Sequence, residues 1–276
     1  MSVDAASVPL PSDKEFRLFQ QLIHARLGIF LPDQKKALLS NRLWKRLQAC
    51  EVRDFAEYYR YIQSPQGGME LNTALELITT NETYFFREQK HFDFLCDDIL
   101  PGLKSKGQRL FRVWSAAAST GEEPYSIAMV LADRCPVSWE LLSSDVNAKV
   151  IEKARLGIYP ELRIRYIPQN YLHRFCRKGI GPQAGNIRVN QELRQAVDFF
   201  TLNLHEDFPD MGKFDLIFLR NVLIYFENDN KVKILERIAK CLAPDGLLFV
   251  GHSESLHGLT PYFAPIRPAI YRLSAR

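Results

Sequence analysis

The strongest constraint on the fold is an alternation of strand-like and helix-like segments that begins near residue 105. Short apolar runs typical of buried strands alternate with segments in which apolar residues recur every three or four positions. The expected strands are 110–114, 139–143, 214–219 and 247–250, and the expected helices are 122–133, 148–154 and 229–242. This order builds crossover units and a mostly parallel sheet with helices on both faces. We therefore expect an α/β fold whose ligands bind at the carboxyl ends of the strands.

The chain before this alternation has helical periodicity alone. Apolar residues recur there at spacings of three and four, as Phe16, Phe19 and Ile23 do. We expect a small all-helical N-terminal domain over residues 13–82, followed by the α/β domain over residues 83–276.

One segment inside the α/β domain, residues 163–198, does not follow the alternation. It contains a short expected helix (168–175), a glycine-rich turn (179–185) and two short strand-like stretches (187–189 and 197–199). We interpret it as a small antiparallel insertion on the parallel core.

Composition disfavours several classes of protein. No run of about 18 apolar residues occurs, so we expect no membrane-spanning helix, and the first residues lack the pattern of a secretory signal. The 5 cysteines form no CxxC pair and the 6 histidines show no HxxxH spacing, so we expect no metal site and a reducing, cytoplasmic location. The net charge of +4 permits an anionic partner without demanding nucleic acid.

The loop after the first expected strand suits the close approach of a ligand. Residues 113–121 are mostly small, which lets a ligand reach the backbone. Two carboxylates, Glu122 and Glu123, follow at the expected helix start and would repel a diphosphate, so a cofactor with a cationic amine or many hydroxyls suits the loop better. Alternatively, Thr120 and Glu123 form a capping box that needs no ligand.

A further acidic residue, Asp145, follows the next expected strand. An acidic residue at this place is typical of ribose binding, because one carboxylate accepts hydrogen bonds from both hydroxyls of a diol. Alternatively, Asp145 caps the helix expected from residue 148. The loop and Asp145 together favour ribose binding.

Two further segments combine polar and aromatic residues. Residues 80–88 (TNETYFFRE) join the two expected domains, and residues 218–226 (FLRNVLIYF) include the end of a strand. In the first, aromatic rings would wall a cationic ligand and Arg87 would pair with a carboxylate. In the second, Arg220 and Asn221 fall at the expected binding edge. Alternatively, the aromatic rings of both segments are core residues and Arg220 snorkels to solvent.

A basic face is expected on the second helix of the N-terminal domain, opposite a stripe of leucines. Its members are Lys35, Arg42, Lys45 and Arg46. Such a face is either simply solvated or a docking surface for an acidic partner.

A ribose-binding carboxylate without a diphosphate site, on a doubly wound sheet, points to S-adenosylmethionine as cofactor. Four segments also resemble one family: residues 81–87 (NETYFFR), 114–126 (WSAAASTGEEPYS), 220–226 (RNVLIYF) and 251–255 (GHSES). Over about residues 13–273 the chain is similar to the chemoreceptor glutamate O-methyltransferases of bacterial chemotaxis, the CheR family. The resemblance implies a Rossmann-like methyltransferase domain with a small antiparallel β-subdomain insertion, preceded by an all-α domain.

The resemblance also implies residue roles. Arg87 and Tyr225 would be the catalytic residues, close to the transferring methyl group, while Glu123 would hold the amino end of the cofactor and Asp145 its ribose. The other cofactor contacts would be Asn81, Thr83, Arg87, Asn203, Leu204, Arg220 and Asn221. The product would be S-adenosylhomocysteine, and no metal would take part.

The implied reaction forms glutamate methyl esters on chemoreceptors and needs no strong general base. A glutamate side chain has a pKa of about 4.3 and is already a carboxylate at pH 7. It would attack the sulfonium methyl in line, so the enzyme must mainly orient and desolvate the reactants.

Two partner surfaces also follow from the resemblance. The basic helix would meet the methylation helices of a receptor, and the loop containing Gly179 and Gly181 would accept a receptor's C-terminal tail as an added strand. Two alternative functions remain open. One is a non-catalytic cofactor-binding regulator or receptor-binding scaffold, and the other is a methyltransferase for nucleic acid or small molecules, which the modest net charge disfavours.

Overall fold

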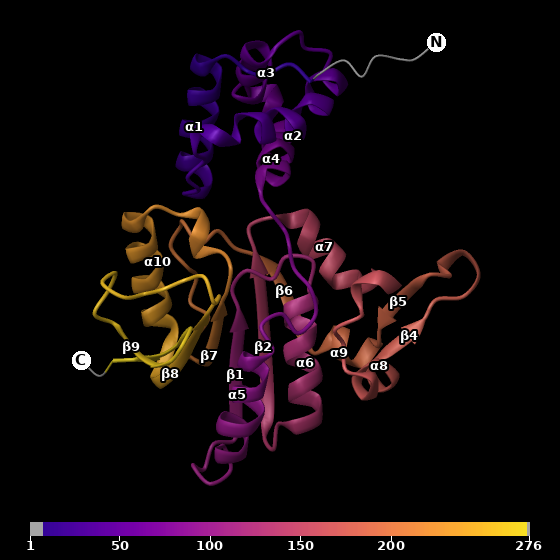
Figure 1. Cartoon of the computed structure of the whole chain (residues 1–276), viewed down its shortest axis with the longest axis vertical. Helices are drawn as coiled ribbons and strands as arrows, with labels where there is room; N and C mark the ends of the chain where they lie inside the picture. The colour runs from indigo at the N-terminus through magenta and orange to yellow at the C-terminus, as the bar shows by residue number, and fades with distance from the viewer. Residues whose placement is uncertain (1–7, 275–276) are drawn as a thin grey trace. The chain divides into compact units, whose positions relative to one another are not determined.

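The computed structural model describes residues 8–274, which divide into two compact units. Unit 1 holds the described residues up to Thr80 together with Tyr225–Glu227, and unit 2 holds Asn81–Ile224 and the chain from Asn228 (Figure 1). The first is helical and the second is an α/β unit, so the expected fold class is confirmed. Among residues 8–274, none of the helices combines the length and the apolar character needed to span a bilayer.

Unit 1 is built from four helices of the described chain. They are α1 (Asp13–Leu27), α2 (Lys36–Ala49), α3 (Phe55–Ile62) and α4 (Gly68–Ile78), with a 3₁₀ turn, η1 (Asp33–Lys35), before α2. A capping box of Ser12 and Glu15 starts α1, and Gly28 in the left-handed conformation (φ 70°) ends it. Phe19 and Ile23 are fully buried, as their helical spacing predicts.

Unit 1 also includes a short piece of chain from much later in the sequence. Phe226 forms an isolated antiparallel bridge with Ile29, and the Phe30 N–H donates to the Tyr225 carbonyl at 2.8 Å. Tyr225 therefore belongs to the helical unit, although the strand that precedes it belongs to the other.

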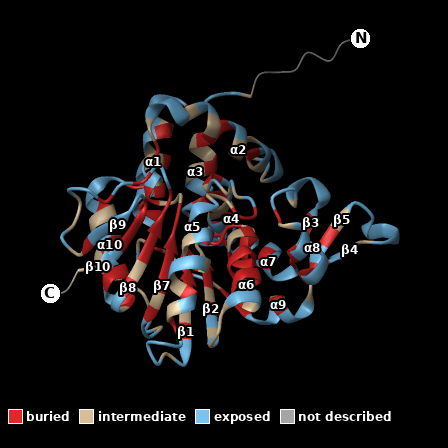
Figure 2. Ribbon diagram, turned by 60° about the horizontal axis from the view of Figure 1, so that its bottom comes forward, coloured by how far each residue is buried: buried red, intermediate tan, exposed pale blue. Residues whose placement is uncertain are grey.

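Unit 2 has a central sheet of seven strands within the described residues, in the order β6-β2-β1-β7-β8-β10-β9. Their bounds are β1 (Leu110–Ser115), β2 (Ser138–Asp145), β6 (Val197–Thr201), β7 (Phe214–Leu219), β8 (Leu242–Val250), β9 (Phe263–Arg267) and β10 (Ile270–Leu273). The first five strands in this order are parallel, and β10 and β9 add to β8 in antiparallel fashion. Figure 2 shows that β7 and β8 are largely buried, as a sheet covered by helices requires.

Helices connect the parallel strands of unit 2. The connecting helices are α6 (Glu122–Arg134), α7 (Ala148–Leu156), α9 (Gln191–Gln195) and α10 (Asn228–Cys241). Helix α5 (Lys90–Phe94) precedes the first strand, and α8 (Gln169–Phe175) lies between β3 and β4. Helices α6 and α7 pack on β2 and β6. Helix α6 is buried along most of its length, which is why its sequence is apolar on nearly every side.

A second, antiparallel sheet has three strands within the described residues, in the order β3-β5-β4. They are β3 (Ile158–Pro160), β4 (Cys176–Lys178) and β5 (Asn186–Val189). An antiparallel insertion is therefore present, but its first strand precedes residue 163, where we expected the insertion to begin.

The expectation that residues 197–199 belong to this insertion is wrong. They form β6, the edge strand of the main sheet, which pairs in parallel with β2 from Leu141↔Val197 to Asp145↔Thr201. Val197 and Phe199 are buried while Asp198 is exposed. Alternating burial of this kind occurs in insertion strands and in half-covered edge strands alike, so local periodicity does not distinguish them.

Several elements were not predicted. Helix α5 continues into a π-helical turn, η3 (Leu95–Ile99), and a 3₁₀ turn, η4 (Leu100–Gly102), and the sheet ends in the hairpin of β9 and β10. These segments are short or interrupted by proline, which obscures their periodicity.

Candidate active site

The carboxyl ends of four parallel strands in unit 2 meet at one edge of the sheet. Ser115 at the end of β1 lies opposite Ser143 of β2 and Phe218 of β7, and Asp145 of β2 lies opposite Thr201 of β6. The loops that follow these strands therefore start side by side. The ends of these strands, the loops and the start of α6 carry most of the predicted cofactor contacts: Glu123, Asp145, Asn203, Leu204, Arg220 and Asn221.

The loop between β1 and α6 is held in a conformation that needs its glycine. Gly121 has φ 96°, and a Cβ atom there would lie 2.8 Å from the Ala154 Cβ and the Tyr159 hydroxyl. Gly121 is also the N-cap of α6 and provides no side-chain cap. The alternative that Thr120 and Glu123 form a capping box is therefore wrong, and the Thr120 hydroxyl instead donates to Glu122 at 2.6 Å.

The centre of this edge is an ion-pair network around Arg220, which is only 4% exposed. Its guanidinium lies 2.9 Å from a Glu123 oxygen and 3.1 Å from a Glu88 oxygen, and it also donates to the Arg87 carbonyl. The Ser115 hydroxyl donates to the other Glu123 oxygen at 2.8 Å. The alternative of a snorkelling Arg220 is therefore wrong, because the guanidinium is buried and paired.

Burial and pairing act in opposite directions on these two carboxylates. Burial raises the pKa of Glu123 above its ordinary value, although Arg220 and the Ser115 hydroxyl work against this rise. Burial would also raise the pKa of Glu88, but Arg220 and the hydrogen bonds from His252 and Asn221 outweigh it and hold that pKa below its ordinary value.

Asp145 is fixed by backbone N–H groups. One oxygen accepts the Ser119 N–H at 2.8 Å and the other accepts the Asn147 N–H at 3.0 Å. Burial raises the pKa of Asp145, and the backbone hydrogen bonds limit that rise. The cap of helix α7 is Asn147, so the alternative that Asp145 caps this helix is wrong.

The segment before α5 contributes both backbone and side-chain contacts to unit 2. The Asn81 carbonyl accepts a hydrogen bond from the Ser119 hydroxyl at 3.0 Å, and Thr83 is half-buried. Arg87 donates to the Glu82 carbonyl at 3.0 Å. Phe86 and Glu88 have positive φ angles of 54° and 59°, a conformation that L-residues rarely adopt.

The aromatic residues of this segment have different surroundings. Phe85 and Phe86 are buried in the core of unit 2, so they match the alternative of structural aromatics. Tyr84 is 40% exposed and its ring lies 4.9 Å from that of Tyr166. The expected aromatic wall therefore reduces to Tyr84, whose ring lies 5.7 Å from the Arg87 guanidinium.

The remaining predicted residues lie after β6 and β7. Asn203 accepts the His205 N–H and donates to Glu206, both at 3.0 Å, and Leu204 is buried. Asn221 has φ 57° and donates its side-chain amide to Glu88 at 3.3 Å. Tyr225 belongs to unit 1, so unit 2 by itself does not hold all the predicted residues together.

Sequence reasoning missed two acidic residues at this edge. Glu88 pairs with Arg220, and Glu254 accepts backbone N–H groups from Asn221 (2.7 Å), Gly251 (2.6 Å) and Ile224 (3.2 Å). Glu254 therefore holds the loop after β7 against the end of β8. Glu254 lies in a segment that carries the family resemblance, residues 251–255, and Glu88 directly follows another, residues 81–87.

Two members of the predicted basic face make hydrogen bonds inside unit 1. Arg42 donates to the carbonyls of Ile78 and Thr79, and Arg46 makes two hydrogen bonds to Glu70, at 2.8 and 2.6 Å. The other two members of the face, Lys35 and Lys45, are exposed.

Family models match almost the whole described chain. Residues 14–79 match the all-alpha domain of CheR methyltransferases, and residues 81–271 match their SAM-binding domain. The chain belongs to the CheR methyltransferase family. S-adenosylmethionine is therefore its cofactor, as expected from the loop and Asp145, and the chain is a methyltransferase.

Individual relatives agree with this family. The chemotaxis protein methyltransferase of Escherichia coli (strain K12) is 44% identical over 95% of this chain and 92% of its own length. Chemotaxis protein methyltransferase 2 of Pseudomonas aeruginosa is 40% identical over 88% of this chain and 86% of its own. Among solved structures, the N-methyltransferase NodS of Bradyrhizobium japonicum covers 63% of this chain and 68% of its own at 16% identity, with a TM-score of 0.34, too distant to add to the argument.

The residues at the sheet edge of this CheR methyltransferase fit its cofactor. Each Asp145 oxygen accepts one backbone N–H, and a carboxylate offers about four lone-pair sites, so ribose hydroxyls have acceptors left. The fully buried Ser143 hydroxyl at the same edge has no hydrogen-bond partner within residues 8–274, as expected where a ligand or water completes a site.

Proposed function

We propose that this CheR methyltransferase transfers a methyl group to glutamate side chains of chemoreceptors and forms methyl esters used in chemotactic adaptation. The relatives named chemotaxis protein methyltransferase, at 40% and 44% identity, support this proposal. The structural observation that carries it is the contrast between two arginines of unit 2. Arg220 is buried between carboxylates, whereas no ion pair involves Arg87 within residues 8–274.

In this proposal, Arg87 orients the substrate carboxylate. Its guanidinium has five N–H donors, and the hydrogen bond to the Glu82 carbonyl uses one of them. The others remain for a carboxylate, which Arg binds well because both groups are planar. A partly exposed Arg87 favours a positioning contact over a buried bidentate pair, which would weaken the nucleophile.

Bound S-adenosylmethionine supplies a methyl group on a positively charged sulfur. The substrate glutamate, with an ordinary pKa of about 4.3, is ionised at neutral pH, so no residue of this chain must remove a proton before the attack. The chain's contribution is binding, orientation and the exclusion of water. Asp145 binds the ribose, Glu123 the amino group, and Tyr225 lies beside the transferring methyl group. Further contacts with the cofactor come from Asn81, Thr83, Asn203, Leu204, Arg220 and Asn221.

The test replaces Arg87 by alanine and follows methyl transfer and cofactor affinity separately. We expect Arg87→Ala to lower the turnover number by about 100-fold, since a misplaced reactant typically loses that much, and to change folding little. The matched control is Arg109→Ala, because Arg109 is an exposed arginine of the same unit. Full activity of Arg87→Ala would refute this role. A wild-type protein that binds cofactor but methylates no receptor in a panel would favour the regulator or scaffold instead.

We also propose that receptor methylation helices, which are acidic, dock on the basic helix of unit 1. Lys35 and Lys45 carry this proposal because they are exposed, while Arg42 and Arg46 add charge next to them. The double variant Lys35→Glu/Lys45→Glu should raise the KM for receptor and leave cofactor affinity unchanged. Equal KM values for wild type and variant would exclude the docking site.

We further propose that a receptor tail peptide adds as a strand to the small antiparallel sheet. Strands β3 and β4 are its edges, and an edge strand has free backbone groups for pairing. The loop after β4 contains Gly179, where a Cβ atom would lie 2.0 Å from the Gln183 carbonyl oxygen, and Gly181, with φ 56°. Shortening this loop should weaken tail-peptide binding and spare the cofactor; unchanged peptide affinity would refute the assignment.

A reducing, cytoplasmic location is part of the same proposal. All 5 cysteines of the chain are free thiols, as is usual in that compartment.

A further inference from the structure

Three side chains of unit 2 form a compact cluster beside the Arg220 network. The Nδ1 atom of His91 lies 3.5 Å from Glu88 Oε2, and the Nε2 atom of His252 lies 3.9 Å from the same oxygen. All three ligand atoms lie within 4.8 Å of one another. Three ligand atoms at such separations are close enough to bind one ion placed between them.

Apart from the 3.5 Å approach to Glu88, the ring nitrogens of His91 make no hydrogen bond that would hold them in place. It is 1% exposed, and neither ring nitrogen has a hydrogen-bond partner within residues 8–274. The ring packs on Phe249, with centroids 5.0 Å apart, and on His252, with centroids 5.1 Å apart. A fully buried imidazole that makes no hydrogen bond requires an explanation, and a bound ion or an ordered water is the usual one.

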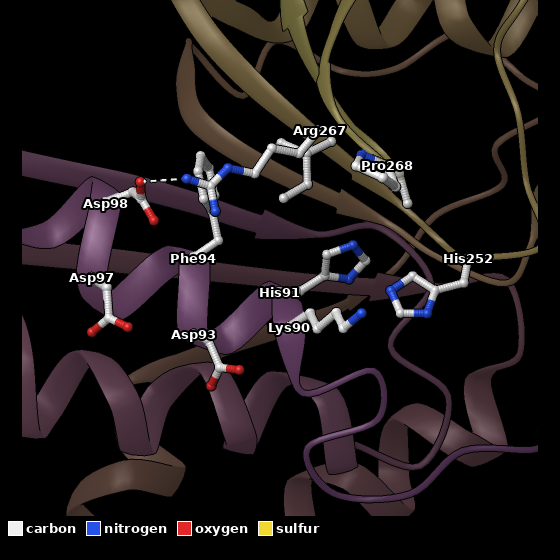
Figure 3. A pocket seen from close by; sticks show the side chains of 11 residues that line it. Lys90, His91, Asp93, Phe94, Asp97, Asp98, His252, Arg267 and Pro268 are labelled. Atoms are coloured by element: carbon white, nitrogen blue, oxygen red, sulfur yellow. Dashed lines mark hydrogen bonds and ion pairs between the residues drawn. The ribbon is translucent and has the colours of Figure 1, made fainter.

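A cavity of about 470 Å³ gives access to the cluster. It is lined by α5, by two aspartates of η3, by His252 after β8 and by residues 267–270 at the turn from β9 to β10. The His91 and His252 rings lie next to each other at one end of it (Figure 3). The His252 side chain is 46% exposed, so it is reachable from solvent and has room to adjust. At the other end, Asp98 is paired with Arg267 at 2.8 Å and is not needed by the cluster.

We propose that Glu88, His91 and His252 form a binding site for a divalent transition-metal ion of the Zn²⁺ type. Two imidazole nitrogens and one carboxylate are a donor set that suits zinc and cobalt, whereas Mg²⁺ and Ca²⁺ prefer oxygen ligands alone. Metal–ligand distances of about 2.0–2.1 Å place tetrahedral ligand atoms roughly 3.4 Å apart. The Glu88–His91 separation of 3.5 Å matches this value. A movement of the exposed His252 ring would have to bring its Nε2 atom closer both to Glu88, now at 3.9 Å, and to His91, now within 4.8 Å. The fourth position would take water from the cavity.

The site shares Glu88 with the active-site network. The Glu88 oxygen that would bind the metal also lies 3.1 Å from Arg220. The ion and this buried guanidinium would therefore share the negative charge of one carboxylate. The sequence shows no metal-ligand spacing because His252 lies on a loop after β8, far along the chain from Glu88 and His91. Our expectation of no metal site rested on the spacing of cysteines and histidines and on a methyl-transfer reaction that needs no metal.

The experiment titrates the purified, metal-stripped full chain with Co²⁺, which replaces zinc and reports its ligands in its absorption spectrum. We expect one equivalent of Co²⁺ to bind per chain. Its absorption spectrum should show visible bands typical of nitrogen and oxygen ligands and no thiolate charge-transfer band. His252→Ala should weaken binding at least tenfold, by analogy with losses of about 10–100-fold when the support of a metal ligand is removed. The matched control is His257→Ala, because His257 is an exposed histidine of the same segment, and it should bind as wild type does.

Three results would overturn the proposal: no binding up to millimolar Co²⁺, an intense thiolate band, or equal affinity in His252→Ala and wild type. The first would leave an ordered water as the partner of His91, and the second would assign the metal to cysteines. Glu88→Gln checks the carboxylate ligand independently. It removes the negative charge and keeps the volume of the side chain, so the affinity for Co²⁺ should fall in this variant too. Since Co²⁺ absorption is read without any substrate, a failure here is separable from a failure of the proposed methyl transfer.

Discussion

Replacing Asp145 by alanine tests the cofactor site at its most specific contact. In the proposed complex, two ribose hydroxyls donate to the carboxylate that Ser119 and Asn147 already hold in place. A hydrogen bond to a charged group contributes about 1.5–3 kcal/mol. The loss of two such bonds amounts to about 3–6 kcal/mol, which weakens binding by roughly 10²–10⁴-fold.

The assay is calorimetric titration of wild type and variant with S-adenosylhomocysteine, with thermal unfolding measured in parallel. Asp198→Ala is the control, because Asp198 is an exposed aspartate on the neighbouring strand and should leave the affinity unchanged. Asp145→Ala also leaves two backbone N–H groups without their acceptor, so a lower melting temperature is expected beside the weaker binding. An affinity within about threefold of wild type, in a folded variant, would refute the ribose role.

Three further predictions concern pH, the loop after β7 and the stability of unit 1. Burial raises the pKa of Asp145, so protonation begins at a higher pH than for an ordinary aspartate, and wild-type cofactor affinity should fall as pH is lowered through that raised pKa. In a calorimetric pH series, Asp145→Asn should lose this part of the pH dependence and keep the part due to Glu123, whose pKa burial also raises. Glu254→Gln replaces an acceptor of three backbone N–H groups by a side chain with one oxygen, so cofactor affinity and melting temperature should both drop; a wild-type melting curve would contradict the anchoring role. Glu70→Ala removes the acceptor of Arg46 and of the buried Tyr58 hydroxyl, and urea unfolding should show a loss of about 2–4 kcal/mol, with a loss below 1 kcal/mol speaking against this network.

The sequence predicts the architecture of unit 2 well where strand and helix periodicities are long. The segments that became β1, β2, β7 and α6 were expected within two residues of their observed bounds, because buried strands and amphipathic helices have different periods. Short elements were harder: β6 has the same alternating pattern as an insertion strand, and only its pairing with β2 assigns it to the main sheet.

The candidate site shows the same contrast between residues that a local pattern reveals and residues that only long-range contacts reveal. The rule that ligands bind at the carboxyl ends of parallel strands was enough to single out Glu123 and Asp145. Glu88 and Glu254 depended on partners far away in the sequence: Glu88 meets Asn221 across 133 positions, and Glu254 meets Asn221 across 33. Tyr225 shows a further limit of prediction from sequence, since nothing in its local sequence indicates that it belongs to the helical unit.

The central claim is that this chain esterifies glutamate carboxylates on chemoreceptors. The most direct measurement incubates the full chain with methyl-labelled S-adenosylmethionine and membranes that contain chemoreceptors, and then treats the labelled receptor with alkali. A carboxyl methyl ester is hydrolysed by base, so we expect label on the receptor and its release as methanol during the alkali treatment. Label that stays on the receptor after alkali would mean methylation of nitrogen, sulfur or an ether oxygen, and would contradict the account.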